Sequence, residues 1–237
     1  NVLADALAEA TQHEELLFDA IVVDEGQDFL DTWWIALEML LRDREGGILY
    51  VFYDDNQLVY EHALALPGDV FKFALSTNCR NTLRIHHAVV QFYQSDFQIT
   101  ARGPQGRPPR LRRYGYGQSD LQAVLTGVLA KLIYTDRVPA RDVAVLGMSG
   151  VNAAFMADVQ KRPGPFTFVD AFPAGAERVC LTSVRRFKGL ESPVVILIVP
   201  AGKAYADDLL YVGISRACQH LEILVAEDVD EAVVDRL

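Results

Sequence analysis

The amino-acid sequence predicts an α/β fold built on parallel sheets. Short apolar runs, which are typical of buried strands, alternate with helical patterns along the chain. Strands that alternate with helices form βαβ units, whose helices cover both faces of a parallel sheet. Polar residues follow several of the runs directly, and ligands bind at the carboxyl ends of strands in such sheets. A functional site is therefore expected at one rim of a sheet.

The first part of the chain supplies elements of both kinds. The helix expected over 31–44 has an apolar face, Asp31 as its N-cap and Gly46-Gly47 as its stop. The helix expected over 120–134 also carries apolar residues at helical spacing. The other expected elements are helices over 4–17 and 83–93, and strands over 20–23, 48–53 and 70–75.

Strands and helices continue to alternate in the rest of the chain. The run 193–199 is almost wholly apolar, as expected for a strand buried on both faces. Pro163-Gly164-Pro165 ends a helix expected over 152–161. The remaining expected strands cover 142–146, 179–184 and 221–225, and the remaining helices cover 207–217 and 228–237.

The most informative stretch is the apolar run 20–23, which ends in Asp24 and Glu25. One carboxylate at such a strand end can hold Mg²⁺ through its water shell, and the next can polarise an attacking water. The alternative is a strand that ends in a solvated acidic turn. Gln57 follows the strand 48–53, so a parallel pair would bring it to the same rim. There its amide would sense the terminal phosphate or orient a water; the alternative is that Gln57 is only a turn residue.

Length and composition limit the classes of protein that fit. The 237 residues, 51% of them hydrophobic, suffice for one large domain or two smaller ones, with a break near Pro67-Gly68. No apolar run reaches the roughly 18 residues of a membrane span, and no cleavable signal pattern is present. Three widely spaced cysteines favour a reducing, cytoplasmic setting over a disulfide framework or zinc site. The start at Asn1, close before a central strand, suggests a fragment.

Basic residues are local in a chain whose net charge is −10. Arg80 lies at a strand-to-helix corner, where phosphate contacts are common; otherwise it caps a neighbour at the surface. The segment 101–117 combines arginines with tyrosines. It is expected to form a loop that runs into a strand. It suits contact with a single nucleic-acid strand, although a solvated basic loop is the favoured interpretation. Its basic residues are Arg102, Arg107, Arg110, Arg112 and Arg113.

Five stretches, taken in order, resemble the motifs of the UvrD/Rep-like group of superfamily 1 helicases. Asp24–Asp28 is similar to the Walker B motif, and Tyr53–Tyr60 to motif III. Asn78–Thr82 is similar to motif IV, Thr182–Glu191 to motif V and Leu210–Ala217 to motif VI. Their order and approximate spacing match the family from about Phe18 to Val225. The resemblance implies two RecA-like lobes with ATP between them: the back part of the first lobe over 1–66 and the second lobe over 67–237.

The resemblance also implies roles for individual residues in binding ATP and Mg²⁺. Asp24 would ligate Mg²⁺, Glu25 would activate the hydrolytic water, and Gln57 would couple the terminal phosphate to the DNA site. Arg80 and Arg216 would act as arginine fingers on that phosphate. The other implied contacts are Gly189 and Glu191 with the nucleotide, the latter at its ribose, and Tyr60, Lys188 and Arg185 with single-stranded DNA.

The chain departs from the family pattern in three places. It contains no Walker A loop, so the resemblance places that loop in an upstream segment of the same polypeptide. We therefore expect this chain alone to hydrolyse no ATP and to bind it weakly or not at all. Motif III continues as Glu61-His-Ala-Leu64, and Arg185 stands where a histidine is common. The interval 83–178 is too short for a large helical insertion, which indicates a compact second lobe.

Two functions of different classes follow. The leading one is part of an ATP-dependent DNA helicase or translocase, which the family would move 3′ to 5′ on single-stranded DNA. The alternative is a non-catalytic, helicase-like interaction or regulatory module, favoured by the acidic charge and the missing loop. A nuclease has little support, because no further carboxylate cluster joins Asp24 and Glu25. The residues leave open the choice between DNA and RNA, and the oligomeric state.

Overall fold

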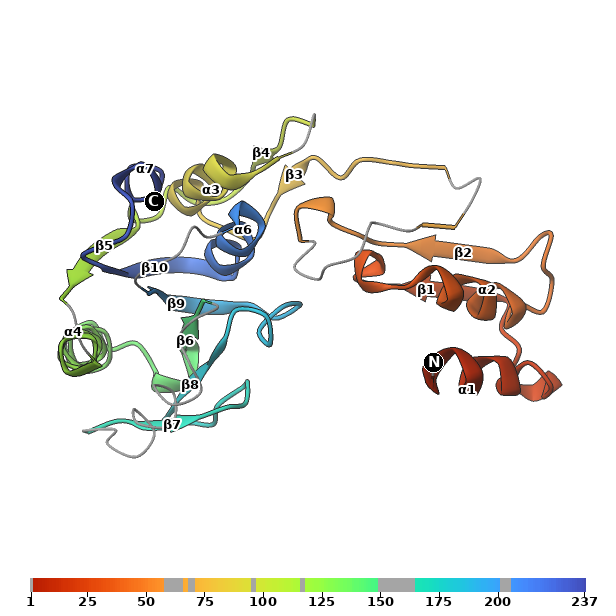
Figure 1. Cartoon of the computed structure of the whole chain (residues 1–237), viewed down its shortest axis with the longest axis horizontal. Coiled ribbons are helices and arrows are strands. Elements are labelled where there is room, and N and C mark those ends of the chain that lie inside the picture. The colour runs from red at the N-terminus through yellow and green to blue at the C-terminus, as the bar shows by residue number, and fades with distance from the viewer. Residues whose placement is uncertain are drawn as a thin grey trace. The chain divides into compact units, whose positions relative to one another are not determined.

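The protein forms two compact units, Asn1–Ala74 and Leu75–Leu237. The computed structural model in Figure 1 describes residues 2–57, 66–67, 71–94, 97–115, 118–148, 165–200 and 206–237. The break between the units lies a few residues beyond the boundary expected after residue 66. Their assignment to a first and a second lobe stays a prediction. No helix in the described ranges is long and apolar enough to cross a membrane.

The first unit is built on a βαβ arrangement, as the sequence predicts. Strands β1 (Ala20–Val23) and β2 (Ile48–Val51) pair in parallel, with Ala20 opposite Ile48 and Val23 opposite Val51. Helix α2 (Asp31–Met39) connects them, and helix α1 (Val2–Ala10) packs against α2. The parallel pairing brings the carboxyl ends of β1 and β2 to one rim.

The strands of the first unit are less buried than expected. Burial alternates along β1, and Val22 is 63% exposed while Val23 is 5% exposed. Tyr50 on β2 is 61% exposed. Strands β1 and β2 are therefore not the fully buried strands that their apolar runs predicted. Among the described residues the sheet has only two strands, and its helices leave one face open to solvent.

The second unit contains a six-stranded sheet in which every neighbouring pair is parallel. Its order is β5 (Arg110–Tyr114), β10 (Ala217–Ala226), β9 (Ser192–Val199), β6 (Val143–Gly147), β8 (Arg178–Ser183) and β7 (Thr167–Val169). The apolar strands β6 and β9 lie in the middle and are almost completely buried. The predicted α/β fold with a parallel, RecA-like sheet is confirmed.

Helices flank this sheet on both sides. Figure 1 shows α3 (Leu83–Val89), α6 (Asp207–Ser215) and α7 (Glu231–Val234) on one side of β10. It shows α4 (Gln118–Ala130), which continues into a π-helical turn over Lys131–Thr135, on the other side. Two short strands, β3 (Thr77–Asn78) and β4 (Thr100–Ala101), pair beside α3. These short strands set the corner that carries Arg80.

Several predicted elements differ from the observed ones. The strand expected over 70–75 does not form in its described part, because the alternating Phe71 and Phe73 find no partner strand and are 92% and 79% exposed. Leu30, not Asp31, is the N-cap of α2, and no side chain caps it. The helices expected over 4–17 and 31–44 end early, at Ala10 and Met39. The helix expected over 152–161 lies outside the described residues.

Candidate functional site

The acidic stretch after β1 forms a tight turn. Asp24 is exposed, Glu25 is partly exposed, and the Asp24 Oδ1 accepts a hydrogen bond of 3.0 Å from the Glu25 amide. Glu25 has φ 53° and ψ 41°, in the left-handed region, and a 3₁₀ turn over Gly26–Asp28 follows. Such a conformation costs a non-glycine residue about 1 kcal/mol or more and is concentrated at functional sites. The turn therefore holds Asp24 and Glu25 directly after the end of β1.

Gln27 ties the ends of the two strands together. Its side chain is completely buried. The Nε2 donates to Glu25 Oε2 at 2.5 Å, and the Oε1 accepts from the Asp54 amide at 3.0 Å. Sequence reasoning missed this role, because nothing in the acidic stretch marks its one amide as buried. Gln27 fixes the Glu25 carboxylate relative to the end of β2.

Gly26 allows this close approach of backbone to side chain. Its amide donates to Phe52 O at 2.9 Å. A Cβ at this position would overlap Val51 Cγ1, so any other residue would force the Val51 side chain or the turn to shift. The acidic turn therefore packs directly on β2.

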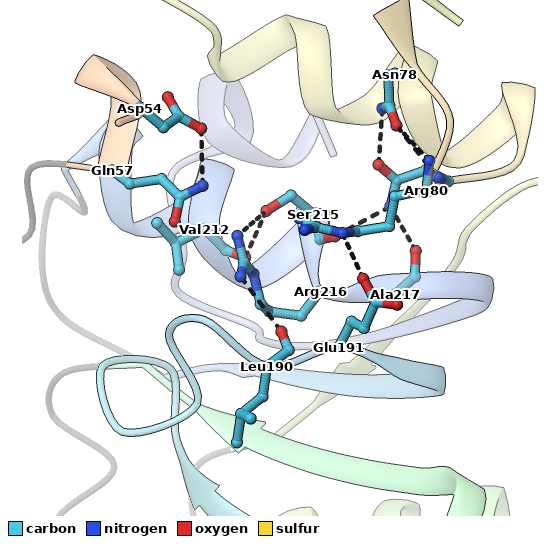
Figure 2. Close-up of polar contacts among 11 residues, drawn as sticks. Asp54, Gln57, Asn78, Arg80, Leu190, Glu191, Val212, Ser215, Arg216 and Ala217 are labelled. Carbon is cyan, nitrogen blue, oxygen red and sulfur yellow. Dashed lines mark hydrogen bonds and ion pairs between the residues drawn. The ribbon is translucent and has the colours of Figure 1, made fainter. Parts of the chain in front are cut away.

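Gln57 lies in the same set of contacts. Its Nε2 donates to Asp54 Oδ2 at 2.7 Å, as Figure 2 shows, and Asp54 Oδ1 accepts from the Asn56 amide at 2.9 Å. Because the Asp54 amide also binds Gln27, a continuous series of hydrogen bonds joins Glu25 to Gln57. The structure thus brings the predicted residues Asp24, Glu25 and Gln57 to one rim of the first unit.

The residues at this rim suit a particular kind of metal binding. No group of three His, Cys, Asp or Glu side chains that could hold a metal exists among the described residues. Mg²⁺ does not need such a group, since it keeps several waters and often takes one or two carboxylates with substrate phosphates. The exposed Asp24 carboxylate fits Mg²⁺ of this kind.

In the second unit, three chain segments bring Arg80, Glu191 and Arg216 together (Figure 2). Arg80 follows β3, Glu191 precedes β9, and Arg216 lies between α6 and β10. Arg80 Nε is 2.5 Å from Glu191 Oε2, and both side chains are about half exposed. The residues that match motifs IV, V and VI therefore converge, although they are far apart in the sequence.

Arg216 is held inside the unit. Its side chain is 1% exposed, and its three nitrogens donate to Val212 O (3.2 Å), Leu190 O (3.3 Å) and Ser215 Oγ (3.1 Å). These contacts, drawn in Figure 2, satisfy a buried charge that would otherwise be costly. The family resemblance implies an arginine that reaches a phosphate; here the guanidinium is bound by the protein itself.

Burial and the same three charged residues affect the pKa of the Cys218 thiol. Burial raises this pKa, and Glu191 raises it further, while Arg80 and Arg216 act in the opposite direction. The thiol is therefore protonated at neutral pH and lies within the influence of all three charged residues.

The loop between β8 and β9 presents the basic residues predicted to meet DNA. Phe187 is completely buried at its centre and makes an edge contact of 5.1 Å between ring centroids with Phe172. Arg185 is exposed, Lys188 is partly exposed, and Gly189 has φ 78°. A residue with a Cβ would be strained at Gly189, so glycine permits the turn into β9. The predicted DNA contact Tyr60 lies outside the described residues.

Some arginines of the segment 101–117 form ion pairs with acids of the second unit. Arg112 Nε lies 3.0 Å from Glu222 Oε2, and Glu222 is 1% exposed on the neighbouring strand β10. Burial raises the pKa of Glu222, but hydrogen bonds from His220 and Arg112 outweigh it, so the pKa lies below its ordinary value. Arg113 binds Glu231 of α7 at 2.6 Å. Arg112 and Arg113 are therefore paired with acids of the second unit, whereas Arg102 and Arg107 are exposed, as the interpretation as a solvated basic loop predicts.

Comparisons with known proteins point to the same stretch of chain. Residues 178–224, from β8 into β10, match the family described as UvrD-like helicase C-terminal domain. The predicted resemblance to the C-terminal portion of UvrD-like helicases is thereby confirmed for this stretch of the chain. These residues include Glu191 and Arg216, which together with Arg80 form a cluster that we call the charged corner. They also include the basic loop with Arg185 and Lys188. No curated protein matches the chain.

A solved structure has a similar fold. It is the C-terminal domain of a possible DNA helicase from Lactobacillus plantarum WCFS1, with a TM-score of 0.51 and 20% sequence identity. The match covers 64% of this chain and 89% of the other. At this identity the likeness concerns the fold, and it agrees with the parallel sheet of the second unit.

Proposed function

We propose that this chain is part of an ATP-dependent DNA helicase or translocase of the UvrD-like kind. The convergence of Arg80, Glu191 and Arg216 supports the proposal most directly. These residues come from three segments that resemble three helicase motifs, and the fold brings them together. Arginines supply the charge that phosphoryl transfer requires at its transition state.

The first unit would provide the groups that handle metal and water. Asp24 would hold Mg²⁺, which would neutralise phosphate charge. Glu25 would accept a hydrogen bond from the attacking water, and Gln27 keeps its carboxylate in place. Gln57, bound to Asp54, would report the state of the terminal phosphate to the rest of the unit.

The second unit would provide cations for nucleotide and for DNA. Arg80 and Arg216 would neutralise the terminal phosphate, and Glu191 and Gly189 would contact the rest of the nucleotide. Arg185 and Lys188 would bind the phosphates of single-stranded DNA, on which the motor would move 3′ to 5′. The missing Walker A loop would come from an upstream segment of the same polypeptide, and the setting would be cytoplasmic.

A second candidate is a non-catalytic, helicase-like regulatory module. One observation favours it: the Arg216 guanidinium is buried and bound by Val212, Leu190 and Ser215. An arginine held in this way would serve the fold rather than a phosphate.

Hydrolysis of ATP by the full-length natural polypeptide tests the proposal, with and without single-stranded DNA. We expect DNA-stimulated turnover that Glu25→Gln abolishes and that Glu38→Gln, an exposed acid on α2 of the same unit, leaves unchanged. The 237-residue chain alone should show no turnover. If the full-length protein is inactive with and without DNA, the regulatory module becomes the better account.

A further inference from the structure

Asn81 connects the two arginines of the charged corner. Its side chain is 3% exposed, and its Nδ2 donates to Ser215 O at 3.0 Å and to Ala217 O at 2.6 Å. These carbonyls lie on either side of Arg216. We propose that Asn81 is a positioning residue that fixes the backbone of Arg216 relative to Arg80. The inference rests on the proposed function for the role of Arg216, but its geometric part stands on the contacts alone.

The backbone around Arg216 is held at every carbonyl. The carbonyl of Arg216 itself accepts from the Ser192 amide at 3.0 Å, and that of Cys218 accepts from the Thr82 amide at 3.1 Å. The last carbonyls of a helix normally lack intrahelical partners. At the end of α6, the Asn81 amide and the start of β9 supply those partners. The turn from α6 into β10 is thereby fixed.

The other end of the Asn81 side chain reaches the Arg80 corner. Asn81 Oδ1 accepts from Asn78 Nδ2 at 2.8 Å. Asn78 Oδ1 in turn accepts from the backbone amides of Arg80 at 2.9 Å and Asn81 at 3.3 Å. One amide group thus joins the segment that carries Arg80 to both neighbours of Arg216.

The contacts require an asparagine. Two carbonyl oxygens need two N–H donors, which the amide supplies and a carboxylate of the same shape does not. Asn81→Asp would place an anion against both carbonyls in a buried position, at the cost of unpaired polar groups. The adjacent Thr82 offers a matched control, since its buried Oγ1 has no hydrogen-bond partner in the described part of the chain. Thr82→Val keeps the shape and removes no such bond.

Amide hydrogen exchange on the 237-residue chain tests the geometry. We expect Asn81→Asp to speed exchange of the Ser192 amide at least tenfold relative to amides in the middle of β9. Thr82→Val should leave this ratio unchanged. A general loss of stability would speed both sets of amides together. An unchanged ratio in Asn81→Asp would overturn the inference, whether or not the protein hydrolyses ATP.

Steady-state kinetics of the full-length protein test the consequence. We expect Asn81→Asp to lower kcat at least tenfold with little change in KM, because Arg216 would act mainly in the transition state. In the Arg216→Ala background the same substitution should cost less than twofold, since coupled residues are not additive. Equal losses in both backgrounds would show that Asn81 serves only the fold. An inactive wild-type protein would refute the proposed function, and the exchange experiment would still decide the geometry.

Discussion

The Arg80 guanidinium lies 2.5 Å from the Glu191 carboxylate, and this pair closes the exposed side of the charged corner. Arg80 and Glu191 are about half exposed, so water screens their attraction, and such pairs contribute about 1 kcal/mol or less to stability. The pair therefore holds the two side chains in place, but the stability of the fold depends little on it. A nucleotide phosphate could exchange with Glu191 as the partner of Arg80.

Glu191→Gln should leave the fold nearly as stable as the wild type and change nucleotide binding. We expect the free energy of unfolding to fall by about 1 kcal/mol or less, measured by urea denaturation of the second unit's transition. In the full-length protein we expect a raised KM for ATP, because the proposed ribose contact is weakened. Asp170→Asn, which removes the partner of the exposed Arg186, is the matched control. A KM equal to that of the wild type would contradict the role of Glu191.

The stability of the second unit should fall as the pH is lowered below about 6.5, because the folded state disfavours protonation of His86. Burial lowers the pKa of His86, with a further effect of His87, and the His86 Nδ1 lies 3.2 Å from the Asn78 Nδ2 donor. The folded state therefore favours neutral histidine. Below the ordinary pKa of about 6.5 the unfolded chain binds a proton that the folded chain does not, so unfolding becomes easier until the folded pKa is reached.

Urea denaturation between pH 7.5 and pH 5 measures this effect. His86→Gln should flatten the pH dependence in that range. His87→Gln, at an exposed position on the same helix, should retain most of it. A wild-type protein whose stability does not change between pH 7 and pH 5.5 would exclude a neutral His86 as a support for Asn78.

Glu222 should be important for the stability of the second unit. Glu222→Ala leaves Arg112 without its buried partner, and we expect a loss of about 2–3 kcal/mol, below the usual range for a buried pair because Arg112 is 39% exposed. Glu222→Gln keeps the shape and one acceptor oxygen, so it retains only one of the two hydrogen bonds, and it should cost less than Glu222→Ala. Since the pKa of Glu222 is lowered, its contribution is present above the ordinary value near 4.3 and is lost as the pH falls below it. Urea denaturation at pH 7 and pH 4 would show this.

Arg185→Ala and Lys188→Ala should weaken binding of single-stranded DNA by the full-length protein. Each lost phosphate contact should reduce the slope of log K against log salt by about 0.7. Arg186→Ala is the matched control, because Arg186 lies in the same loop but is paired with Asp170. Fluorescence anisotropy with an oligothymidine at several salt concentrations would measure both quantities. Equal effects of all three substitutions would show that the loop attracts DNA by its general charge rather than through Arg185 and Lys188.

The sequence predicted the strands of the large sheet well, for a physical reason. A run such as 193–199 is apolar on both faces, and only a central strand suits that pattern. The alternation of Phe71 and Phe73 predicted a strand too, but a strand also needs a partner, which a local pattern does not reveal. Strands of two or three residues, such as β4 and β7, give too few positions for any periodicity.

The charged corner shows the same division between local and distant information. Arg80, Glu191 and Arg216 were found because each lies in a motif of recognisable residues. Asn81 was not, since its bonds to Ser215 and Ala217 join residues more than 130 positions apart. The burial of Asn81 and its two acceptors arise only when distant segments fold together, so no local sequence pattern predicts them.

The two bonds from the Asn81 amide also have a mechanical consequence. They join the end of a helix and the beginning of a strand to a single point on another segment. A force applied to residues 78–82 would be divided between α6 and β10, so it would not turn Arg216 about its own backbone. Arg80 and Arg216 would instead be displaced together, as parts of one rigid group.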